Sequence, residues 1–250
     1  MVDLLVLADA LRDAERDRAP IPPLPALTPE DAYEIQLINI RRRSSPVVGY
    51  KVGLTSAAMQ EMLGVREPDY GHLLADMRVA GAASPSRYCY PRVEIEVAFI
   101  LGADLPGADC TESDVLAATE ALAPSIELID SRIAAWQIRL TDTIADNGSS
   151  AGFVLGSARV APSSVDLRGI EAWLNRDGIE VARGRSDAIL GNPATAVAWV
   201  ARTLGARGER LRAGHVILPG AMARAVDAHP GDEFIGAFEG LGDVSLTFTP

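Results

Sequence analysis

Cysteine, histidine and long apolar runs are all scarce in this 250-residue sequence. The two cysteines, Cys89 and Cys110, lack the CxxC spacing of a thiolate metal site and are too few for a disulfide framework. The three histidines, at positions 72, 215 and 229, are too scattered for a zinc-type cluster. No apolar segment is long enough for a membrane helix, and the N-terminus lacks the features of a signal peptide. We therefore expect a cytoplasmic protein without a membrane partner.

Positive charge is also in deficit, because 34 acidic residues outnumber 23 basic ones and the formal net charge is −11. A nucleic-acid partner would need a basic patch, and the only basic run is Arg41-Arg42-Arg43 at the end of a predicted helix. The charge balance therefore argues against nucleic-acid binding. The 48% hydrophobic content is typical of a soluble globular protein with a sizeable core.

Lysine is the scarcest basic residue, since Lys51 is the single lysine among the 23 basic residues. It stands in the apolar segment VVGYKVGL, which predicts a strand. Arginine serves wherever a plain positive charge is needed, so one lysine in an apolar strand indicates a site that requires a compact ammonium of tunable pKa. The alternative is a chance surface lysine, which the apolar neighbours disfavour.

The N-terminal part, residues 1–45, predicts a helical segment ahead of a catalytic domain formed by residues 46–250. Leucines at helical spacing in residues 4–11 indicate an amphipathic helix. The following APIPPLPALTPE is too rich in proline for a helix and predicts an extended connector. A second helix is expected from the N-cap Thr28 to about Arg43, shortly before a proline that stops it.

The rest of the sequence predicts short strands and few helices. We expect a tight hairpin turn at Asp177-Gly178. The other expected strands are residues 47–54, 91–101, 124–132, 214–218, 224–228 and 244–248. A short strand is also expected within EPDYGHLLADMRV, and an apolar strand after the polar loop in TDTIADNGSSAGFVLG. The expected helices are residues 56–64, Thr111 to about Leu122, and 193–204. Helices are too few for a doubly wound sheet, so we predict an α+β fold with a mixed, rolled, mostly antiparallel sheet and N-terminal helices.

Two glutamates stand two residues apart in the predicted strand 91–101, and a third stands in the strand 124–132. Residues two apart on a strand point to the same side, so Glu94 and Glu96 share one face. In a partly buried site their repulsion would be costly unless a cation neutralises it. Glu127, flanked by apolar residues, is the natural third ligand, and three carboxylates favour Mg²⁺ or Mn²⁺ over zinc. The alternative is a solvated face of an edge strand.

Seven motifs follow one another along the chain: GYKVGLTS, EPDYGHLLADM, PRVEIEVAF, PSIELIDSR, DTIADNGSS, GRSDAILGNP and GERLRAGHVILPG. Their order and spacing resemble the hydratase/decarboxylase branch of the fumarylacetoacetate hydrolase superfamily, from about Asp31 to Phe248. Within that branch the sequence is similar to hydratases of 2-hydroxypenta-2,4-dienoate. The segments GRSDAILGNP and ILPG are similar to actinobacterial steroid-pathway hydratases acting on 2-hydroxyhexa-2,4-dienoate. The resemblance implies the rolled sheet of the superfamily's C-terminal domain.

The resemblance implies that Glu94, Glu96 and Glu127 bind the metal, and that Lys51 and Asp69 are catalytic. The dienol would ketonise to a conjugated 2-oxo-3-enoate, whose 2-oxo group the metal would polarise. Water would then add at C4, and C3 would be reprotonated. Lys51 would hold a carboxylate or enolate oxygen of the substrate, and the alternative role is proton transfer. The cation and burial would lower its pKa, although the glutamates oppose that shift. Asp69 would transfer a proton or activate the water; the alternative is a turn-forming aspartate after proline.

The resemblance also implies a substrate pocket. Leu54 would line it, and a polar loop would close on the substrate unless its serines only shape a turn. The loop residues are Asp146, Asn147, Ser149 and Ser150. The sequence departs from many relatives at Gly148, Asn192 and Pro219, where alanine, histidine and threonine are frequent. These departures leave the metal motif intact and bear on the choice of substrate.

The implied activity is metal-dependent hydration of a five- or six-carbon 2-hydroxyalka-2,4-dienoate to a 4-hydroxy-2-oxoalkanoate, in meta-cleavage degradation of aromatic or steroid rings. Two alternatives stay open. One is a 4-oxalocrotonate decarboxylase, in which Arg183, Arg185 or Arg224 would hold the second carboxylate. The other is a non-catalytic partner of the decarboxylase or aldolase. A C–C bond hydrolase is less favoured, since no added histidine-acid pair stands near the metal motif. The resemblance further implies a homo-oligomer, a pentamer or decamer, and association with the downstream aldolase or decarboxylase.

Overall fold

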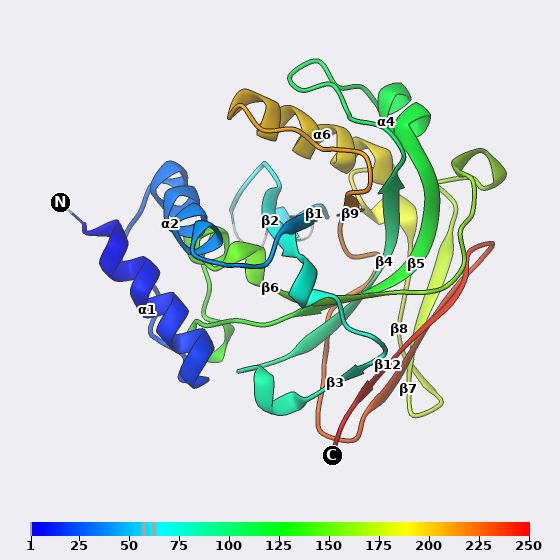
Figure 1. Cartoon of the computed structure of the whole chain (residues 1–250). Coiled ribbons are helices and arrows are strands. Elements are labelled where there is room, and N and C mark those ends of the chain that lie inside the picture. The colour runs from blue at the N-terminus through cyan, green and yellow to red at the C-terminus, as the bar shows by residue number, and fades with distance from the viewer. Residues whose placement is uncertain (1, 57–58, 62–63) are drawn as a thin grey trace.

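Two β-sheets with helices around them make up the protein in the computed structural model, which describes residues 2–56, 59–61 and 64–250 (Figure 1). In the larger sheet, the short strand β10 (Val226–Asp227) pairs with the first residues of β4. Its other strands follow in the order β2 (Asp69–Leu74), β1 (Val47–Gly53), β9 (Val216–Leu218), β4 (Arg92–Leu101), β5 (Thr119–Ile129) and β6 (Ser150–Leu155). The helix expected over residues 56–64 includes positions 57–58 and 62–63 and so lies outside the described residues.

The larger sheet is mostly antiparallel, as the sequence predicted. β1 and β9 run parallel, whereas β4 and β5 pair in antiparallel fashion along nearly their whole length. The outer strands β2 and β6 contact each other, so the sheet rolls round on itself. This arrangement confirms the predicted α+β fold with a mixed, rolled sheet.

The smaller sheet packs against β4 and β5 of the larger one. Its strands follow in the order β3 (Ala82–Ala83), β12 (Gly242–Phe248), β11 (Glu233–Phe238), β7 (Glu171–Arg176) and β8 (Ile179–Arg185). The β7–β8 hairpin turns at Asp177 and Gly178, both left-handed with φ of 52° and 79°, which confirms the predicted turn. β11 was not predicted from the sequence, because Gly236 interrupts its apolar side chains.

Five α-helices have bounds within the described residues. They are α1 (Leu4–Asp17), α2 (Pro29–Arg41), α4 (Glu112–Ala118), α5 (Leu140–Ala145) and α6 (Pro193–Ala206). Thr28 caps α2 in a reciprocal capping box with Asp31, as expected from the sequence. None of the helices in the described ranges is long and apolar enough to cross a membrane.

The helix that begins after Thr111 was expected to run to about Leu122, and this prediction is wrong. α4 ends at Ala118, and Thr119 already has the extended backbone of β5. The strand therefore begins five residues before Pro124, the position that the sequence indicated. The segment TEALA has fair helical propensity, but residues 119–123 pair with the end of β4, and this tertiary pairing outweighs the local preference.

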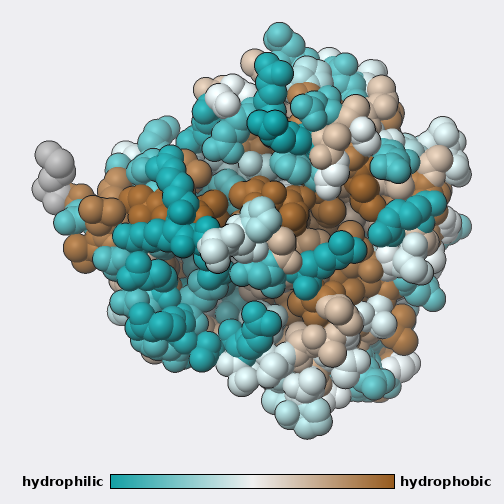
Figure 2. Space-filling model, viewed as in Figure 1, coloured by the Kyte–Doolittle hydropathy of each residue, from teal (hydrophilic) through white to brown (hydrophobic). Residues whose placement is uncertain are grey.

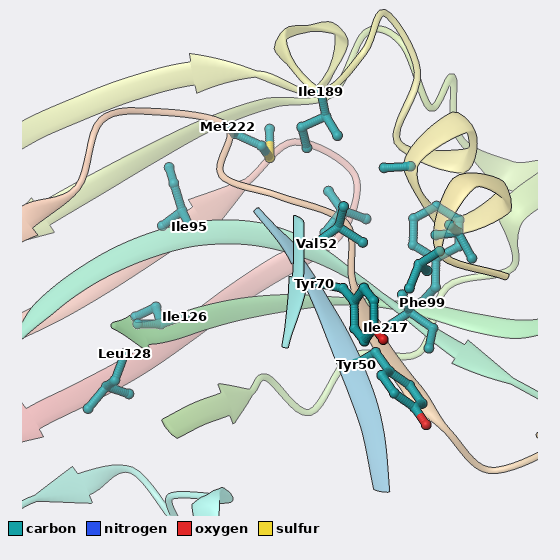
Figure 3. Packing of buried hydrophobic residues seen from close by; sticks show 14 of the residues in the cluster. Tyr50, Val52, Tyr70, Ile95, Phe99, Ile126, Leu128, Ile189, Ile217 and Met222 are labelled. Carbon is teal, nitrogen blue, oxygen red and sulfur yellow. The ribbon is translucent and has the colours of Figure 1, made fainter. Parts of the chain in front are cut away.

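The two faces of the larger sheet carry different apolar clusters. The main core lies on one face, where Val52, Phe99 and Ile217 pack together with Tyr50 and Tyr70 (Figure 3). A smaller cluster lies on the other face and includes Ala98, Ala123, Phe153 and Leu218. Because strand residues alternate, Lys51, Asp69, Glu94, Glu96 and Glu127 share the face of the smaller cluster.

The N-terminal residues pack onto the rest of the chain. The Gln36 side chain on α2 donates to the carbonyl oxygens of Tyr70, 3.1 Å away, and Ile144, 2.7 Å away. The proline-rich connector is extended, and Ile21 pairs with the main chain on both sides of Ile133. These contacts bring α2 against α5, directly before the polar loop of residues 146–150.

Candidate active site

Three carboxylates converge on the face that carries the smaller cluster. Glu94 on β4 lies opposite Glu127 on β5, and Glu96 lies opposite Ser125. One oxygen from each carboxylate lies within 4.8 Å of the others. Glu96 and Glu127 are fully buried and Glu94 is half-buried, while β4 has β5 and β9 as neighbours. The alternative of a solvated edge strand is therefore wrong.

Several oxygens of this cluster lack a hydrogen-bond partner among the described residues. They are Oε1 of Glu96 and both carboxylate oxygens of Glu127, whereas Oε2 of Glu96 accepts from the Gly220 amide at 2.7 Å. Burial raises the pKa of Glu94 to about 7 and the pKa of Glu96 well above its usual range, and Glu127 adds to both shifts. Buried, unpartnered carboxylate oxygens around one point are the donor set of a hard divalent cation, so the residues fit such an ion.

Lys51 on β1 brings a positive charge to this cluster. Its Nζ lies 3.4 Å from Oε2 of Glu127, an ion-pair distance without hydrogen-bond geometry, and donates to the Gly148 carbonyl at 2.9 Å. Burial acts to lower the pKa of Lys51, but the surrounding carboxylates, Glu127 foremost, outweigh it and the pKa rises. In the protein without an ion, several acids surround one amine and prevail over burial. The expected lowering of this pKa refers to the site with a bound cation and stays a prediction.

Asp69 opens β2 on the same face as Lys51. It is 1% exposed, and its Oδ1 has no hydrogen-bond partner in the described part of the chain. Burial raises the pKa of Asp69, and Lys51 opposes that rise. A methyl group on Gly53, across the strand pair, would lie 2.1 Å from Oδ1, so only glycine leaves room for this carboxylate. Thr143 Oγ1 approaches the other oxygen, Oδ2, at 3.5 Å.

The polar loop lies beside Lys51, but its first two side chains point to other protein groups. Asp146 forms a buried ion pair with Arg132, with Nε to Oδ1 at 2.5 Å. Burial raises the pKa of Asp146 to about 6 although Arg132 lowers it. The Asn147 amide accepts from the His72 main-chain N–H at 2.7 Å and donates to the His72 carbonyl at 2.9 Å. Both side chains therefore brace the loop.

The two serines of the loop differ in their surroundings. Ser149 Oγ lies 3.1 Å from Thr143 Oγ1 and so connects to the side chain next to Asp69. Ser150 Oγ is buried and has no partner among the residues that the structure describes. Ser150 lines a cavity of about 130 Å³ between the loop and helices α1 and α2, and the three glutamates are not among the cavity's lining residues.

Leu54 follows the last residue of β1 and is half-buried, with a left-handed φ of 56°. Asn192, one of the three departures from many relatives, lies at the N-cap of α6. Its side chain accepts from the Ala194 amide at 3.1 Å and donates to Glu112 at 2.9 Å. Asn192 thus links α6 to α4. Pro219 stands directly before Gly220, the residue whose amide holds Glu96.

Sequence reasoning missed four groups that contact the predicted site residues. The Gly220 amide and the Gly148 carbonyl act through the main chain, so side-chain patterns carried no signal for them. Thr143, which approaches Asp69, stands within the DTIADNGSS motif and was a detectable candidate. Arg132 closes the PSIELIDSR motif, and its position next to a buried strand was the signal for a buried arginine.

Comparisons with known proteins agree with the geometry. Residues 76–249 match the fumarylacetoacetate (FAA) hydrolase C-terminal family. The chain is 43% identical over 251 residues to a 2-hydroxyhexa-2,4-dienoate hydratase of Comamonas testosteroni, covering 97% of this chain and 95% of that protein. It is 43% identical over 250 residues to a 2-keto-4-pentenoate hydratase of Paraburkholderia xenovorans, covering 96% and 93%.

Solved structures show the same architecture. A 4-oxalocrotonate decarboxylase from Pseudomonas putida G7, complexed with magnesium and adipate, matches with a TM-score of 0.93 and 35% identity over 98% of this chain and 97% of that one. A fumarylpyruvate hydrolase from Pseudomonas aeruginosa, with Mn²⁺ and pyruvate, shares the fold at a TM-score of 0.64 and 22% identity, covering 83% and 92%. By its family match and its near full-length relatives, this chain belongs to the fumarylacetoacetate hydrolase family.

Proposed function

We propose that this chain is a metal-dependent hydratase that adds water to a 2-hydroxyalka-2,4-dienoate and yields a 4-hydroxy-2-oxoalkanoate. The observation that carries the proposal is the convergence of Glu94, Glu96 and Glu127 within 4.8 Å, with Lys51 beside them. The relatives that are 43% identical over nearly the whole chain are named as hydratases of such dienoates. A five- or six-carbon dienoate is the substrate class that these names support. The pathway that we propose for it is meta-cleavage degradation of aromatic or steroid rings.

The metal that we propose is Mg²⁺ or Mn²⁺, held by Glu94, Glu96 and Glu127. Its ligands would be carboxylates alone, a set that suits hard, oxygen-preferring cations. The unpartnered oxygens of Glu96 and Glu127 are the atoms that such an ion would satisfy. When bound, the ion supplies Lewis-acid polarisation of the substrate's 2-oxo group. Two structures of the decarboxylase, described with magnesium and with calcium, support an oxygen-liganded dication.

Lys51 and Asp69 are the catalytic residues in this proposal. The ammonium of Lys51 has three donors, of which one is used by the Gly148 carbonyl. Another can point at a substrate oxygen and stabilise the negative charge that develops there as water adds at C4. Asp69 is buried with a raised pKa, and its Oδ1 has no hydrogen-bond partner among the described residues, so it can hold a proton and deliver it to carbon. Leu54 and the two loop serines are proposed to contact the substrate.

A decarboxylase of the same family is the second candidate, and the TM-score of 0.93 to one such enzyme favours it. Decarboxylation of 4-oxalocrotonate needs a cation for the second carboxylate. Arg183 pairs with Glu180 and Arg185 pairs with Asp187, and both arginines are more than half exposed. Arg224 is exposed and donates to a main-chain carbonyl. None of the three is a buried cation facing the carboxylates, which supports hydration over decarboxylation.

The test uses the purified protein with 2-hydroxypenta-2,4-dienoate, 2-hydroxyhexa-2,4-dienoate and 4-oxalocrotonate. Hydration is followed as loss of the conjugated-dienol absorbance, with Mg²⁺, with Mn²⁺ and after chelation by EDTA. We expect metal-dependent hydration of at least one dienoate, no CO₂ from 4-oxalocrotonate, and loss of turnover in Glu127→Gln. CO₂ release without hydration would make the chain a decarboxylase. No turnover of any substrate would favour the non-catalytic partner.

We also propose a cytoplasmic homo-oligomer, a pentamer or decamer, that associates with the downstream aldolase or decarboxylase. Leu5 and Val6 on α1 are 55% and 59% exposed, and a band of hydrophobic side chains starts over this helix and crosses the face in Figure 2. Apolar surface of this kind suits contact with another protein. Light scattering of the purified chain tests the assembly, and a mass equal to one chain would contradict it.

A further inference from the structure

The turn formed by Asn147, Gly148 and Ser149 is left-handed at three consecutive residues, with φ of 55°, 62° and 56°. Glycine adopts this conformation freely, whereas asparagine and serine do so at a cost in free energy. Such a backbone persists only where surrounding contacts hold it. The turn follows α5 directly, and β6 begins at the next residue.

Arg132 holds the start of this turn through three donors. Its main-chain N–H donates to Oδ2 of Asp146 at 2.9 Å, its Nε donates to Oδ1 at 2.5 Å, and one terminal nitrogen donates to the Asp146 carbonyl at 2.7 Å. Arg132 and Asp146 are 5% and 4% exposed, so water competes little with these bonds. At the other end of the turn, the Asp130 amide donates to the Ser149 carbonyl at 2.9 Å.

The turn contacts both residues to which we assign the chemistry. The Gly148 carbonyl accepts from Lys51 Nζ at 2.9 Å, which is shorter than the 3.4 Å between Nζ and Glu127. Ser149 Oγ meets Thr143 Oγ1 at 3.1 Å, and Thr143 Oγ1 approaches Asp69 at 3.5 Å. The position of the turn therefore sets where the ammonium lies.

We propose that Arg132 is a positioning residue for Lys51, acting through Asp146 and the Gly148 carbonyl. This inference rests on the proposed function, because it assigns to Arg132 a share in a reaction that Lys51 performs. In this proposal the Asp146 side chain anchors the turn to Arg132 and does not contact the substrate. A purely structural role for Arg132 is the competing explanation, since its carbonyl also accepts from Ile21 of the N-terminal connector at 2.9 Å.

The position of Lys51 can be followed without measuring catalysis, because the chain contains a single lysine. Lys51 is the single lysine of the chain, so labelling with ¹⁵N-lysine gives one side-chain signal in an NMR spectrum. We expect this Nζ signal of the Mg²⁺-loaded protein to shift or broaden in Arg132→Met and in Asp146→Asn. The matched control is Arg183→Met, which breaks the exposed Arg183–Glu180 pair and should leave the signal unchanged. An unchanged signal in both loop variants would overturn the proposal.

The kinetic readout separates positioning from simple loss of structure. In Arg132→Met we expect kcat to fall about 10- to 100-fold, since a small displacement of a reacting group has such effects. KM and the affinity for Mn²⁺, measured by calorimetry without substrate, should change less than about twofold, because the three glutamates keep their places. The double variant Arg132→Met/Asp146→Asn should be no slower than the slower single variant, because both remove one interaction.

The outcomes distinguish this inference from the proposed function. If the wild-type protein hydrates no dienoate, the proposed function fails, while the lysine signal still decides whether Arg132 positions Lys51. If the wild-type protein is active and a folded Arg132→Met variant keeps its kcat, the inference on Arg132 fails alone. Should Arg132→Met not fold, Asp146→Asn takes its place, since it removes the charge without opening a cavity.

Discussion

Glu94 and Glu127 lie directly opposite each other on β4 and β5, although like charges facing each other across two strands destabilise a sheet. Neither carboxylate can turn fully to solvent, since Glu127 is fully buried and Glu94 half-buried. Without a cation, the site relieves the repulsion by taking up protons, and burial raises the pKa of Glu94 to about 7. The stability of the protein must therefore depend on both pH and metal.

The first prediction concerns the metal-free protein in EDTA. A carboxyl whose pKa is higher in the folded than in the unfolded state stabilises the fold when it is protonated. That stability is complete below the usual pKa of about 4.5 and is lost as pH rises through the folded value of about 7 for Glu94. The free energy of unfolding, measured with urea, should thus fall between pH 5 and pH 8. Saturating Mg²⁺ should reduce the fall, and equal slopes with and without Mg²⁺ would contradict a metal at these residues.

The second prediction concerns Glu127→Gln. Removing one buried charge relieves the repulsion, so the metal-free variant should unfold at a higher temperature than the metal-free wild type. The wild type should gain about 2.7 kcal/mol when Mn²⁺ is present at 100 times its Kd, whereas the variant should gain much less. Thermal unfolding with and without Mn²⁺ measures both effects. The control is Glu120→Gln on the same strand, an exposed glutamate outside the cluster.

The third prediction concerns the lysine. Lys51→Met leaves the buried Glu127 without its ion-pair partner, so it should destabilise the metal-free protein by about 3–5 kcal/mol in urea unfolding. Lys51→Arg keeps the charge but is bulkier, and space is short because a methyl group on Gly148 would already lie 3.1 Å from Lys51 Cδ. We expect Lys51→Arg to fold and to lose about 100-fold in kcat. Full activity of Lys51→Arg would show that charge alone suffices.

The sequence predicted the part of the site that follows from strand geometry. The two-residue repeat of a strand places Glu94 and Glu96 on one face, whatever the rest of the chain does. The pairing that sets Glu127 opposite Glu94 is tertiary, and only its apolar flanks and the family resemblance indicated it. A shift of β4 by one residue in its pairing register would have turned Glu94 and Glu96 to the main core.

The polar loop could not be predicted in the same way. Asp146 and Asn147 are polar in either role, and the sequence gives no sign that their partners are Arg132, 14 residues away, and His72, 75 residues away. The predicted boundary between α4 and β5 was wrong for a related reason, because pairing with β4 overrides the helical preference of residues 119–123. Long-range contacts decide both cases.

The fourth prediction concerns Asn192, where many relatives have histidine. Because its side chain caps α6 and bonds Glu112, Asn192→Ala should lower the free energy of unfolding by about 1–2 kcal/mol. The ratio of kcat/KM for the five- and six-carbon dienoates should stay unchanged, since this side chain bonds structural groups. Asn192→Ser is the control, as a serine hydroxyl can keep the cap on the Ala194 amide without adding a charge beside Glu112. A changed substrate ratio in Asn192→Ala would place this residue in the pocket after all.

The last prediction concerns Asp69, whose Oδ1 has no partner among the described residues and whose pKa is raised by burial. Asp69→Asn keeps the shape but cannot transfer a proton, so kcat should fall by about 10²- to 10⁴-fold. Folding should survive, because a neutral amide is easier to bury than a carboxylate. The affinity for Mn²⁺ serves as the control and should stay within about twofold. If Asp69→Asn keeps most of its kcat, proton transfer belongs to another group, and Asp69 has only a structural role at the start of β2.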